Sequence, residues 1–364
     1  MPVARALAAA GWWVAVASSD RLAPARFSRR CARFLRVPPS SSPEFVESVL
    51  RAARLCSAAA VFPLEDRTIQ RLLDRGPTER PVAPLPPGRC YRAAFDKWKT
   101  IQIAERADVD RPRTVSLSDT KIADAVDATG LPAILKPRRG YGAHGVRLVR
   151  SLQELSQVLR SRPKSELLLQ EFVPHGGAGG LCALVPQKGE PVTFTFLRLR
   201  EYPPSGGPST LRVAKRVREI EDAGLRLLKA MDWRGLAMVE FRRHARTGRW
   251  ILMEINGRVW GSVALAIEAG VNFPALALED AMGASVPQPR WRSNVLCRWW
   301  LGDMLHLLAR RRLVRLALEP LLLPFLGVRH DTLSVKDPLP FLTTLLGAPL
   351  VMIEKRAKLW GRGW

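Results

Sequence analysis

The chain has 364 residues, 47% of them hydrophobic and 25% charged, with a formal net charge of +24 and a pI near 11.1. This composition excludes an intrinsically disordered chain and is typical of a folded globular protein. It also excludes a membrane-spanning helix, because the best candidate segment, 345–353, falls well short of the roughly 18 residues that a span needs.

The positive charge is distributed along the whole sequence and is carried mostly by arginine, as a GC-rich genome would produce. No zinc-finger spacing, basic–aromatic repeat or RNA-binding signature accompanies it, so nucleic acid is a disfavoured partner. The five cysteines are scattered and contain no C-x-x-C pair, which indicates reduced thiols and a cytoplasmic protein without a disulfide frame or zinc site.

Residues 1–88 alternate helical and apolar extended segments, which predicts a Rossmann-like α/β lobe with a parallel sheet. The first residues faintly resemble a signal peptide, but a helix followed by a buried strand explains them better. No opening strand or Gly-rich phosphate turn comes first, so we expect either that the start codon is placed too late or that the lobe is truncated and has lost this strand. For the same reason we do not expect a dinucleotide-binding domain. The expected helices are 3–10, 43–56 and 65–75, and the expected strands are 13–17 and 58–62.

A Pro-rich connector, 80–89, leads into a small α+β lobe over residues 89–175. Its strand–Gly-rich loop–strand pattern begins at Lys136 and continues through a loop over 137–145. Glycines let backbone N–H groups approach phosphate oxygens closely. The expected helices are 91–108, 118–129 and 152–159, and the expected strands are 132–136, 146–149 and 167–173.

Residues 176–288 form a third segment, with helices expected at 217–231 and 261–269 and a β-hairpin over 236–256. Side chains alternate along a strand, so Glu254 and Asn256 face the same way, with Glu240 within reach on the partner strand. Two carboxylates and an amide oxygen form a hard-oxygen set that suits Mg²⁺ and also accepts Mn²⁺. The alternative is a hairpin whose polar side chains are merely solvated.

Together these motifs resemble the ATP-grasp superfamily. The resemblance covers about residues 1–290, in the order Asp96-Lys97, Lys136 with its Gly-rich loop, the strand 170–173, Glu240, and the run 253–258. It is greatest to predicted carboxylate–amine ligases with a carbamoyl-phosphate-synthase-like grasp domain. It implies a fold of mixed α/β and α+β class, with the truncated Rossmann-like lobe in front and a helical extension behind.

The resemblance also implies roles for individual residues. Lys97 and Lys136 would hold ATP phosphates, and one or two Mg²⁺ ions would be bound by Glu240, Glu254 and Asn256. Arg258 would meet the transferred phosphoryl group and, with Lys136, would serve catalysis. The flexible lid would contain Gly140, Gly142 and Gly145, and the adenine would face Glu171, Phe172 and Val173.

Three features depart from the family pattern. The usual Asn-Pro-Arg is here Asn256-Gly257-Arg258, which would loosen the strand end. His144 stands where the lid commonly has a small residue, as an exposed imidazole or a phosphate contact. No acidic residue follows Glu171 at the usual spacing, so the contact to the ribose hydroxyls is unassigned.

The tract 198–210 is the candidate for substrate recognition, because arginine forks match anionic oxygens. We expect Arg198, Arg200 and Ser209 to contact the substrate, against the alternative of a surface hairpin with solvated arginines.

The last segment, 289–364, is expected to be a separate helical extension rich in Trp, Arg and Leu. Residues 291–326 would either pack on the grasp core or lie as an interfacial helix at the inner face of an anionic membrane. A homodimer is compatible with this architecture, and nothing in the sequence fixes the role of the extension.

The leading functional prediction is an ATP-dependent ligase that activates a carboxylate as an acyl phosphate for attack by an amine, ammonia or thiol, releasing ADP and phosphate. Its partners would be a small carboxylate and a small amine or thiol. The alternative is a catalytically silent ATP-binding or membrane-associated scaffold with the same fold. The sequence names neither the acid nor the nucleophile.

Overall fold

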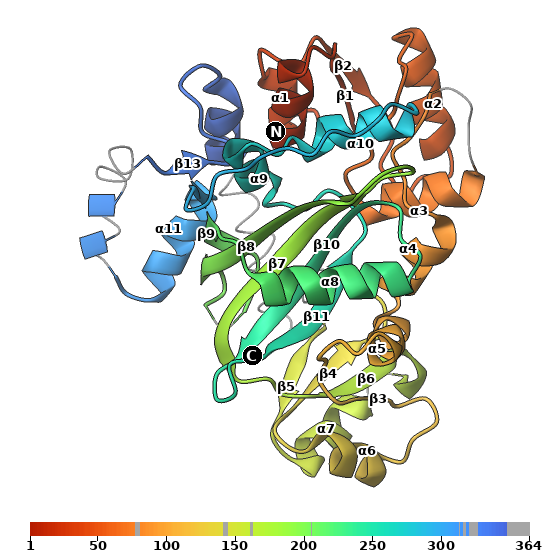
Figure 1. Cartoon of the computed structure of the whole chain (residues 1–364), viewed down its shortest axis with the longest axis vertical. Coiled ribbons are helices and arrows are strands. Elements are labelled where there is room, and N and C mark those ends of the chain that lie inside the picture. Colours follow the sequence, from red (N-terminus) through yellow and green to blue (C-terminus); the bar gives the residue numbers. More distant parts are fainter. Residues whose placement is uncertain are drawn as a thin grey trace.

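The computed structural model describes residues 1–76, 81–140, 145–160, 163–204, 206–312, 314–315, 318–319 and 327–347. A large antiparallel sheet lies at its centre, with a smaller sheet below it and the N-terminal segment above (Figure 1). The resulting fold is of mixed α/β and α+β class, as predicted.

The N-terminal lobe contains a short parallel pair of strands, β1 (Ala15–Ser18) and β2 (Arg33–Arg36). Its helices are α1 (Pro2–Ala9), η1 (Pro24–Phe27), α2 (Phe45–Leu55) and α3 (Asp66–Arg75). The strand expected at 58–62 is reduced to one parallel bridge between Ala60 and Val82. We did not anticipate β2, because its sequence RFLR carries arginines at both ends and lacks an apolar run.

Two helices replace the single one expected at 91–108: α4 (Gly88–Phe95) and α5 (Lys97–Arg106). Asp96 separates them, since its backbone is extended and its carboxylate accepts hydrogen bonds from the N–H groups of Trp98 and Lys99 at 3.1 and 3.3 Å. Asp96 is therefore the N-cap of α5. This cap fixes the position of Lys97, the first residue of α5.

The small lobe is a four-stranded antiparallel sheet in the order β3-β6-β4-β5. One face packs on its helices through buried Leu135, Leu155 and Leu169, while Lys136 and Gln170 lie on the opposite face. Its strands are β3 (Thr114–Ser116), β4 (Ala133–Pro137), β5 (Arg147–Val149) and β6 (Leu167–Glu171), and its helices are α6 (Ile122–Thr129), α7 (Leu152–Leu159) and η2 (Lys164–Glu166).

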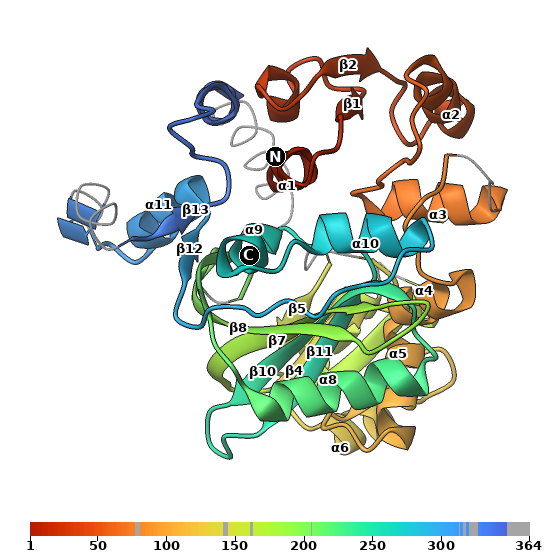
Figure 2. The ribbon, with the colours of Figure 1, turned by 45° about the horizontal axis from the view of Figure 1, so that its top comes forward.

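Within the described residues the large sheet has the order β11-β10-β7-β8-β9-β12-β13. Helix α8 (Arg218–Ala230) covers one face, whereas α9 (Val263–Ala269) and α10 (Phe273–Ala281) cover the other together with α1 (Figure 2). Its central strands are β7 (His175–Val185), β8 (Val192–Glu201), β9 (Ser209–Ala214), β10 (Gly235–His244) and β11 (Trp250–Asn256).

The C-terminal segment joins this sheet instead of forming only helices. Strand β12 (Leu296–Arg298) pairs with β9, and β13 (Arg329–His330) pairs with β12, while α11 (Trp300–Ala309) packs beside them. Trp291 contacts the ring of Phe194 in the core. These contacts bury residues that an interfacial helix would leave free, although most of 316–326 lies outside the described residues.

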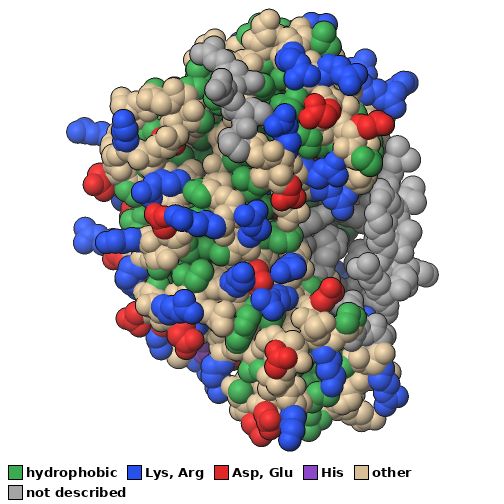
Figure 3. Space-filling model, turned by 90° about the vertical axis from the view of Figure 1, so that its right-hand side faces the viewer, with side chains coloured by type: hydrophobic (Ala, Val, Ile, Leu, Met, Phe, Trp, Pro, Cys, Tyr) green, Lys and Arg blue, Asp and Glu red, His purple; other side chains and the backbone are tan. Residues whose placement is uncertain are grey.

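No helix in the described part of the chain combines the length and the apolar character that crossing a bilayer requires. The positive charge does not gather in a single patch on the face seen in Figure 3, where acidic side chains lie among the basic ones.

Candidate functional site

The hairpin predicted to hold a metal forms the β11 edge of the large sheet. Glu240 on β10 is the direct cross-strand partner of Glu254 on β11, and Asn256 is the partner of Met238. A register shift follows Glu240, so the strands pair irregularly beside the two carboxylates. The Asn256 side-chain N–H approaches Glu254 Oε1 at 3.4 Å. The structure therefore brings the three predicted oxygen ligands together on adjacent strands.

Both predicted lysines approach this edge from the small lobe and α5. Lys136 Nζ donates to Gln170 Oε1 at 2.8 Å, and Lys97 Nζ donates to the Gly140 carbonyl at 2.6 Å. Burial and, to a smaller extent, the nearby charge of Lys97 lower the pKa of Lys136 to about 8, while the charge of Glu254 opposes this change. Burial also lowers the pKa of Lys97, against the charges of Glu254 and other acids.

A narrow pocket marks the point where these elements meet. Its lining comes from α3, α4, α5, the start of the Gly-rich loop and β11: Asp66, Ala94, Phe95, Lys97, Gly140, Glu254, Ile255 and Asn256. Cations and carboxylates thus face each other across a small space, an arrangement suited to a phosphate chain bridged by a divalent ion.

Glu240 is held in a buried environment. Burial raises its pKa, the Arg198 guanidinium acts in the opposite direction, and the charge of Glu254 raises the pKa again. Arg198 Nη2 lies 2.5 Å from Glu240 Oε2. Arg198 therefore compensates one of the two carboxylates, and it lies beside the predicted metal ligands.

A divalent cation fits this donor set. Two carboxylates on facing strand positions repel each other, and Mg²⁺ would relieve that repulsion through oxygen ligands. Among the described residues, no three His, Cys, Asp or Glu side chains cluster as metal ligands. The ion would therefore depend on Glu240, Glu254, Asn256, water and the phosphates themselves.

The strand end at 171–173 is predicted to face the adenine, and this role stays a prediction. Glu171 accepts hydrogen bonds from the backbone N–H and Nε of Arg113, at 3.1 and 3.2 Å, on the face away from Lys136. Its neighbour Gln170, which we overlooked, faces Lys136 because side chains alternate along β6. Val173 is buried and Phe172 is half-buried, and nothing in their contacts shows a nucleotide-binding role.

The Gly-rich loop is described only at its ends. Gly140 has a φ of +134°, a conformation that favours glycine, and its carbonyl accepts the Lys97 hydrogen bond. Gly145 also has a positive φ, of +77°. Gly142 and His144 lie outside the described residues, so their predicted lid and phosphate roles remain predictions.

Arg258 is positioned by the N-terminal lobe. Its Nε donates to Asp66 Oδ2 at 2.8 Å, and Tyr91 donates its hydroxyl to Asp66 Oδ1 at 2.9 Å. The glycine before it also has a steric reason. A Cβ at Gly257 would lie 2.8 Å from Trp233 and 3.0 Å from Tyr91, so aromatic packing excludes a larger residue here without a local shift.

Arg200 and Ser209, the other predicted substrate residues, make different contacts from Arg198. Arg200 donates to both carboxylate oxygens of Glu319 at 2.7 Å and to Asp303 at 3.0 Å, under α11. Among the described residues, the buried Ser209 hydroxyl has no hydrogen-bond partner. The structure therefore does not bring Arg200 to the metal ligands, because register shifts after Arg198 turn the strand end toward α11.

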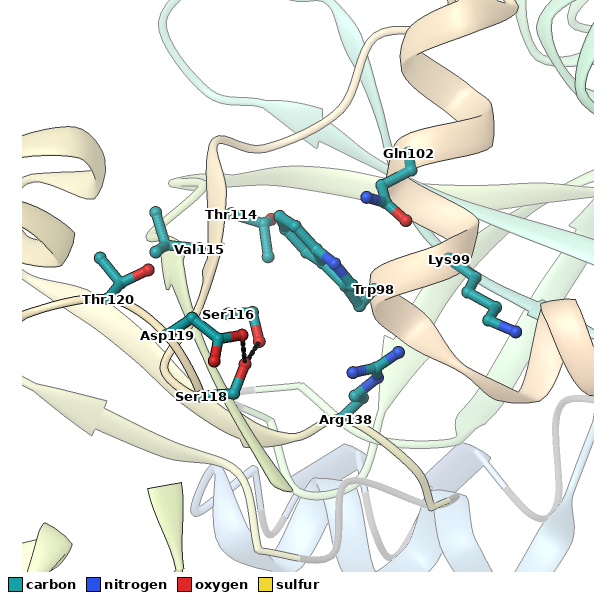
Figure 4. A pocket seen from close by; sticks show the side chains of 10 residues that line it. All are labelled: Trp98, Lys99, Gln102, Thr114, Val115, Ser116, Ser118, Asp119, Thr120 and Arg138. Atoms are coloured by element: carbon teal, nitrogen blue, oxygen red, sulfur yellow. Dashed lines mark hydrogen bonds between the residues drawn. The ribbon is translucent and has the colours of Figure 1, made fainter. Parts of the chain in front are cut away.

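A second pocket of about 390 Å³ lies between α5 and the β3 side of the small lobe (Figure 4). The indole of Trp98 lies across it, with Arg138 and Lys99 on one side and Ser116, Ser118 and Asp119 on the other. It contains none of the predicted ATP, metal or substrate residues.

Comparison with known proteins places both lobes in one superfamily. Residues 94–187 match the RimK-like ATP-grasp domain, and residues 192–300 match the ATP-grasp domain of the biosynthetic pathway with the Ter operon.

Among curated proteins, N5-carboxyaminoimidazole ribonucleotide synthase of Synechococcus elongatus is 25% identical over 205 residues, 54% of this chain and 51% of that protein. The carbamoyl phosphate synthase large chain of Clostridium acetobutylicum is 23% identical over 50% of this chain and 18% of that one. The chain thus spans about half the length of the first relative and less of the second.

Among solved structures, N5-carboxyaminoimidazole synthetase from Staphylococcus aureus, complexed with ADP, superposes with a TM-score of 0.64 at 15% identity. The superposition covers 81% of this chain and 77% of that one. At this identity it supports the fold alone. The two domain matches identify residues 94–187 and 192–300 as ATP-grasp segments, and the superposition agrees with that fold.

Proposed function

We propose that the protein is an ATP-dependent ligase that joins a carboxylate to an amine, ammonia or thiol, releasing ADP and phosphate. The observation that supports this most directly is the meeting of Lys97, Lys136, Glu240, Glu254 and Asn256 at one sheet edge. Two lysines, two carboxylates and an amide there provide cations for phosphate and oxygen ligands for a metal.

The proposed reaction has two steps. In the first, a substrate carboxylate oxygen attacks the γ-phosphorus of ATP, the bond to the β–γ bridging oxygen breaks, and ADP leaves. In the second, the nucleophile attacks the acyl carbon, the bond to the phosphate oxygen breaks, and the nucleophile loses a proton. Phosphoryl transfer of this kind needs positioning and charge neutralisation more than covalent help from the protein.

The residues would divide these tasks. Lys97 and Lys136 would hold phosphate oxygens as compact point charges. Glu240, Glu254 and Asn256 would hold Mg²⁺, which when bound would neutralise charge on the β- and γ-phosphates. Arg258, whose side chain lies beside Asn256, would stabilise charge on the transferred phosphoryl group.

Arg198 would contribute after the metal ligands are engaged. Arg198 pairs with Glu240 in this structure. A divalent ion bound at Glu240 would leave part of the Arg198 charge free for an anionic substrate. The half-length coverage of the first relative leaves the acid and the nucleophile open. The N-terminal lobe and the tract around Arg198 would select them.

The test is a panel of carboxylic acids and amines incubated with the protein and MgATP. We expect ADP and phosphate in equal amounts whenever a matching acid and nucleophile are present. Formation of AMP and pyrophosphate would exclude this chemistry. MgATP binding without turnover across a broad panel would instead favour the silent-scaffold alternative.

A further inference from the structure

Asp66 connects the N-terminal lobe to Arg258, the arginine of the proposed site. It is the first residue of α3 and lies 192 positions before Arg258 in the sequence. One carboxylate oxygen accepts Arg258 Nε at 2.8 Å, and the other accepts the Tyr91 hydroxyl at 2.9 Å. Both members of the ion pair are largely buried, with side-chain exposures of 22% and 15%.

The same carboxylate belongs to the lining of the narrow pocket. It lies there with Lys97, Glu254 and Asn256, and its negative charge favours the protonated form of Lys97. Asp66 is therefore at the proposed phosphate site and is not simply a contact between distant parts of the fold.

The contacts of Arg258 show what this carboxylate achieves. The Nη1 atom of Arg258 donates to the Val259 carbonyl at 3.0 Å, and its Nη2 atom approaches Asn256 Oδ1 at 3.4 Å. An arginine has five N–H donors, so these contacts and the Asp66 bond use three within the described residues and leave two. Because the guanidinium is planar, an anchor at Nε fixes the plane in which its remaining N–H groups lie.

We propose that Asp66 is a positioning residue, by which the N-terminal lobe orients Arg258 toward the transferred phosphoryl group. This inference rests on the proposed function. It adds a role for a residue that the sequence analysis did not select, and it makes the N-terminal lobe a part of the reaction site.

A simple effect of charge predicts the opposite change in phosphate affinity when Asp66 is removed. The direction of that change therefore tests the inference. If Asp66 were only a neighbouring carboxylate, its removal would reduce repulsion and tighten phosphate binding. If it orients Arg258, its removal weakens phosphate binding although a negative charge has been lost.

The experiment measures the affinity of inorganic phosphate for the MgADP-saturated protein by calorimetry. We expect Asp66→Asn to weaken phosphate about tenfold or more, with MgADP affinity nearly unchanged. Asp74→Asn, an exposed acid on the same helix, is the matched control and should leave both affinities unchanged.

A double-mutant cycle with Arg258→Ala separates positioning from a general structural effect. We expect the double variant to bind phosphate no more weakly than Arg258→Ala alone, since Asp66 acts through that arginine. Additive losses, or unchanged or tighter phosphate binding in Asp66→Asn, would overturn the inference.

Two further outcomes are distinguishable. If Asp66→Asn does not fold, Tyr91→Phe removes one partner of the carboxylate and should weaken phosphate about threefold, whereas no change would overturn the proposal. If the wild-type protein binds neither MgADP nor phosphate, the proposed function fails and the inference fails with it. If it binds both and Asp66→Asn behaves like Asp74→Asn, only the inference fails.

Discussion

Two groups of polar and charged residues at the large sheet differ in how their charges are balanced. The hairpin-edge group comprises Lys97, Lys136, Glu240, Glu254 and Asn256, and its lysines come from α5 and from the small sheet. The tail group, around β9, β12 and α11, comprises Arg200, Arg212, Arg298, Asp303 and Asp331. Strands of the large sheet contribute residues to both groups.

In the tail group, charges meet in direct pairs. Arg298 Nε lies 2.8 Å from Asp303 Oδ2, and both side chains are fully buried. Arg212 pairs with Asp331 in the same way. In the hairpin-edge group, by contrast, the two lysines donate to an amide and a carbonyl oxygen and form no ion pair within the described residues.

This difference distinguishes charged residues that stabilise the fold from charged residues that can bind a ligand. A fully buried pair such as Arg298–Asp303 holds segments of the chain together, and its acid leaves little of the arginine's charge for a ligand. Cations held by neutral oxygens beside a carboxylate keep their charge available. By this criterion Arg200, bound to Glu319 and Asp303, belongs to the fold, although its sequence context resembles that of Arg198.

Breaking the tail group should produce the largest loss of stability. Asp303→Asn would leave Arg298 buried without its counter-charge, and we expect the free energy of unfolding to fall by about 3–5 kcal/mol. MgATP affinity of the folded variant should stay within about twofold, because Asp303 lies in the tail group. Chemical denaturation and calorimetry measure the two quantities.

The control for this variant is Asp110→Asn, which removes an exposed ion pair to Arg249. It should cost less than about 1 kcal/mol. Loss of MgATP binding in Asp303→Asn without a loss of stability would contradict the separation of the two groups.

The pH dependence of ATP affinity tests the hairpin-edge group. The pKa of Lys136 is about 8 in the free protein, so this lysine loses its proton as the pH rises above that value. Phosphates favour the charged form, so the contribution of Lys136 to ATP affinity should fall about tenfold per pH unit between roughly 8 and 10.

We therefore expect proton uptake on MgATP binding near pH 8.5, measured by calorimetry in buffers of different ionisation enthalpy. Lys136→Met should bind ATP weakly at every pH and take up fewer protons. Equal proton uptake in the wild type and in this variant would rule out Lys136 as the titrating group.

The smallest effect concerns two neighbours on β6. Glu171→Ala removes a partly exposed pair to Arg113 and should change stability by less than about 1 kcal/mol, with little effect on ATP. Gln170→Ala removes the oxygen that holds Lys136 and should weaken MgATP about threefold to tenfold. A larger loss of MgATP affinity in Glu171→Ala than in Gln170→Ala would contradict the role given to Gln170.

Much of the architecture could be predicted from the sequence because long periodic segments and strand alternation carry it. The relation of Glu254 to Asn256 follows from a period of two, and Glu240 follows from the hairpin. Short strands such as β2, β3 and β12 could not be predicted in the same way, because three or four residues with polar neighbours have no detectable period.

The site partners depend on contacts between distant segments, which no local pattern specifies. Asp66 meets Arg258 from another lobe, and Gly257 is required by the rings of Trp233 and Tyr91. The contact of Gln170 with Lys136 likewise depends on the pairing of β6 with β4, which places these two residues on one face of the small sheet.

The measurement that tests the central claim most directly is the affinity for ATP with and without Mg²⁺, in the wild type, in Glu254→Gln and in Glu190→Gln. Glu190 is an exposed residue away from the hairpin and is the matched control. We predict that Mg²⁺ strengthens ATP binding at least about tenfold in the wild type and the control, and not in Glu254→Gln. Full Mg²⁺ dependence retained in Glu254→Gln would contradict the assignment of the hairpin as the metal site.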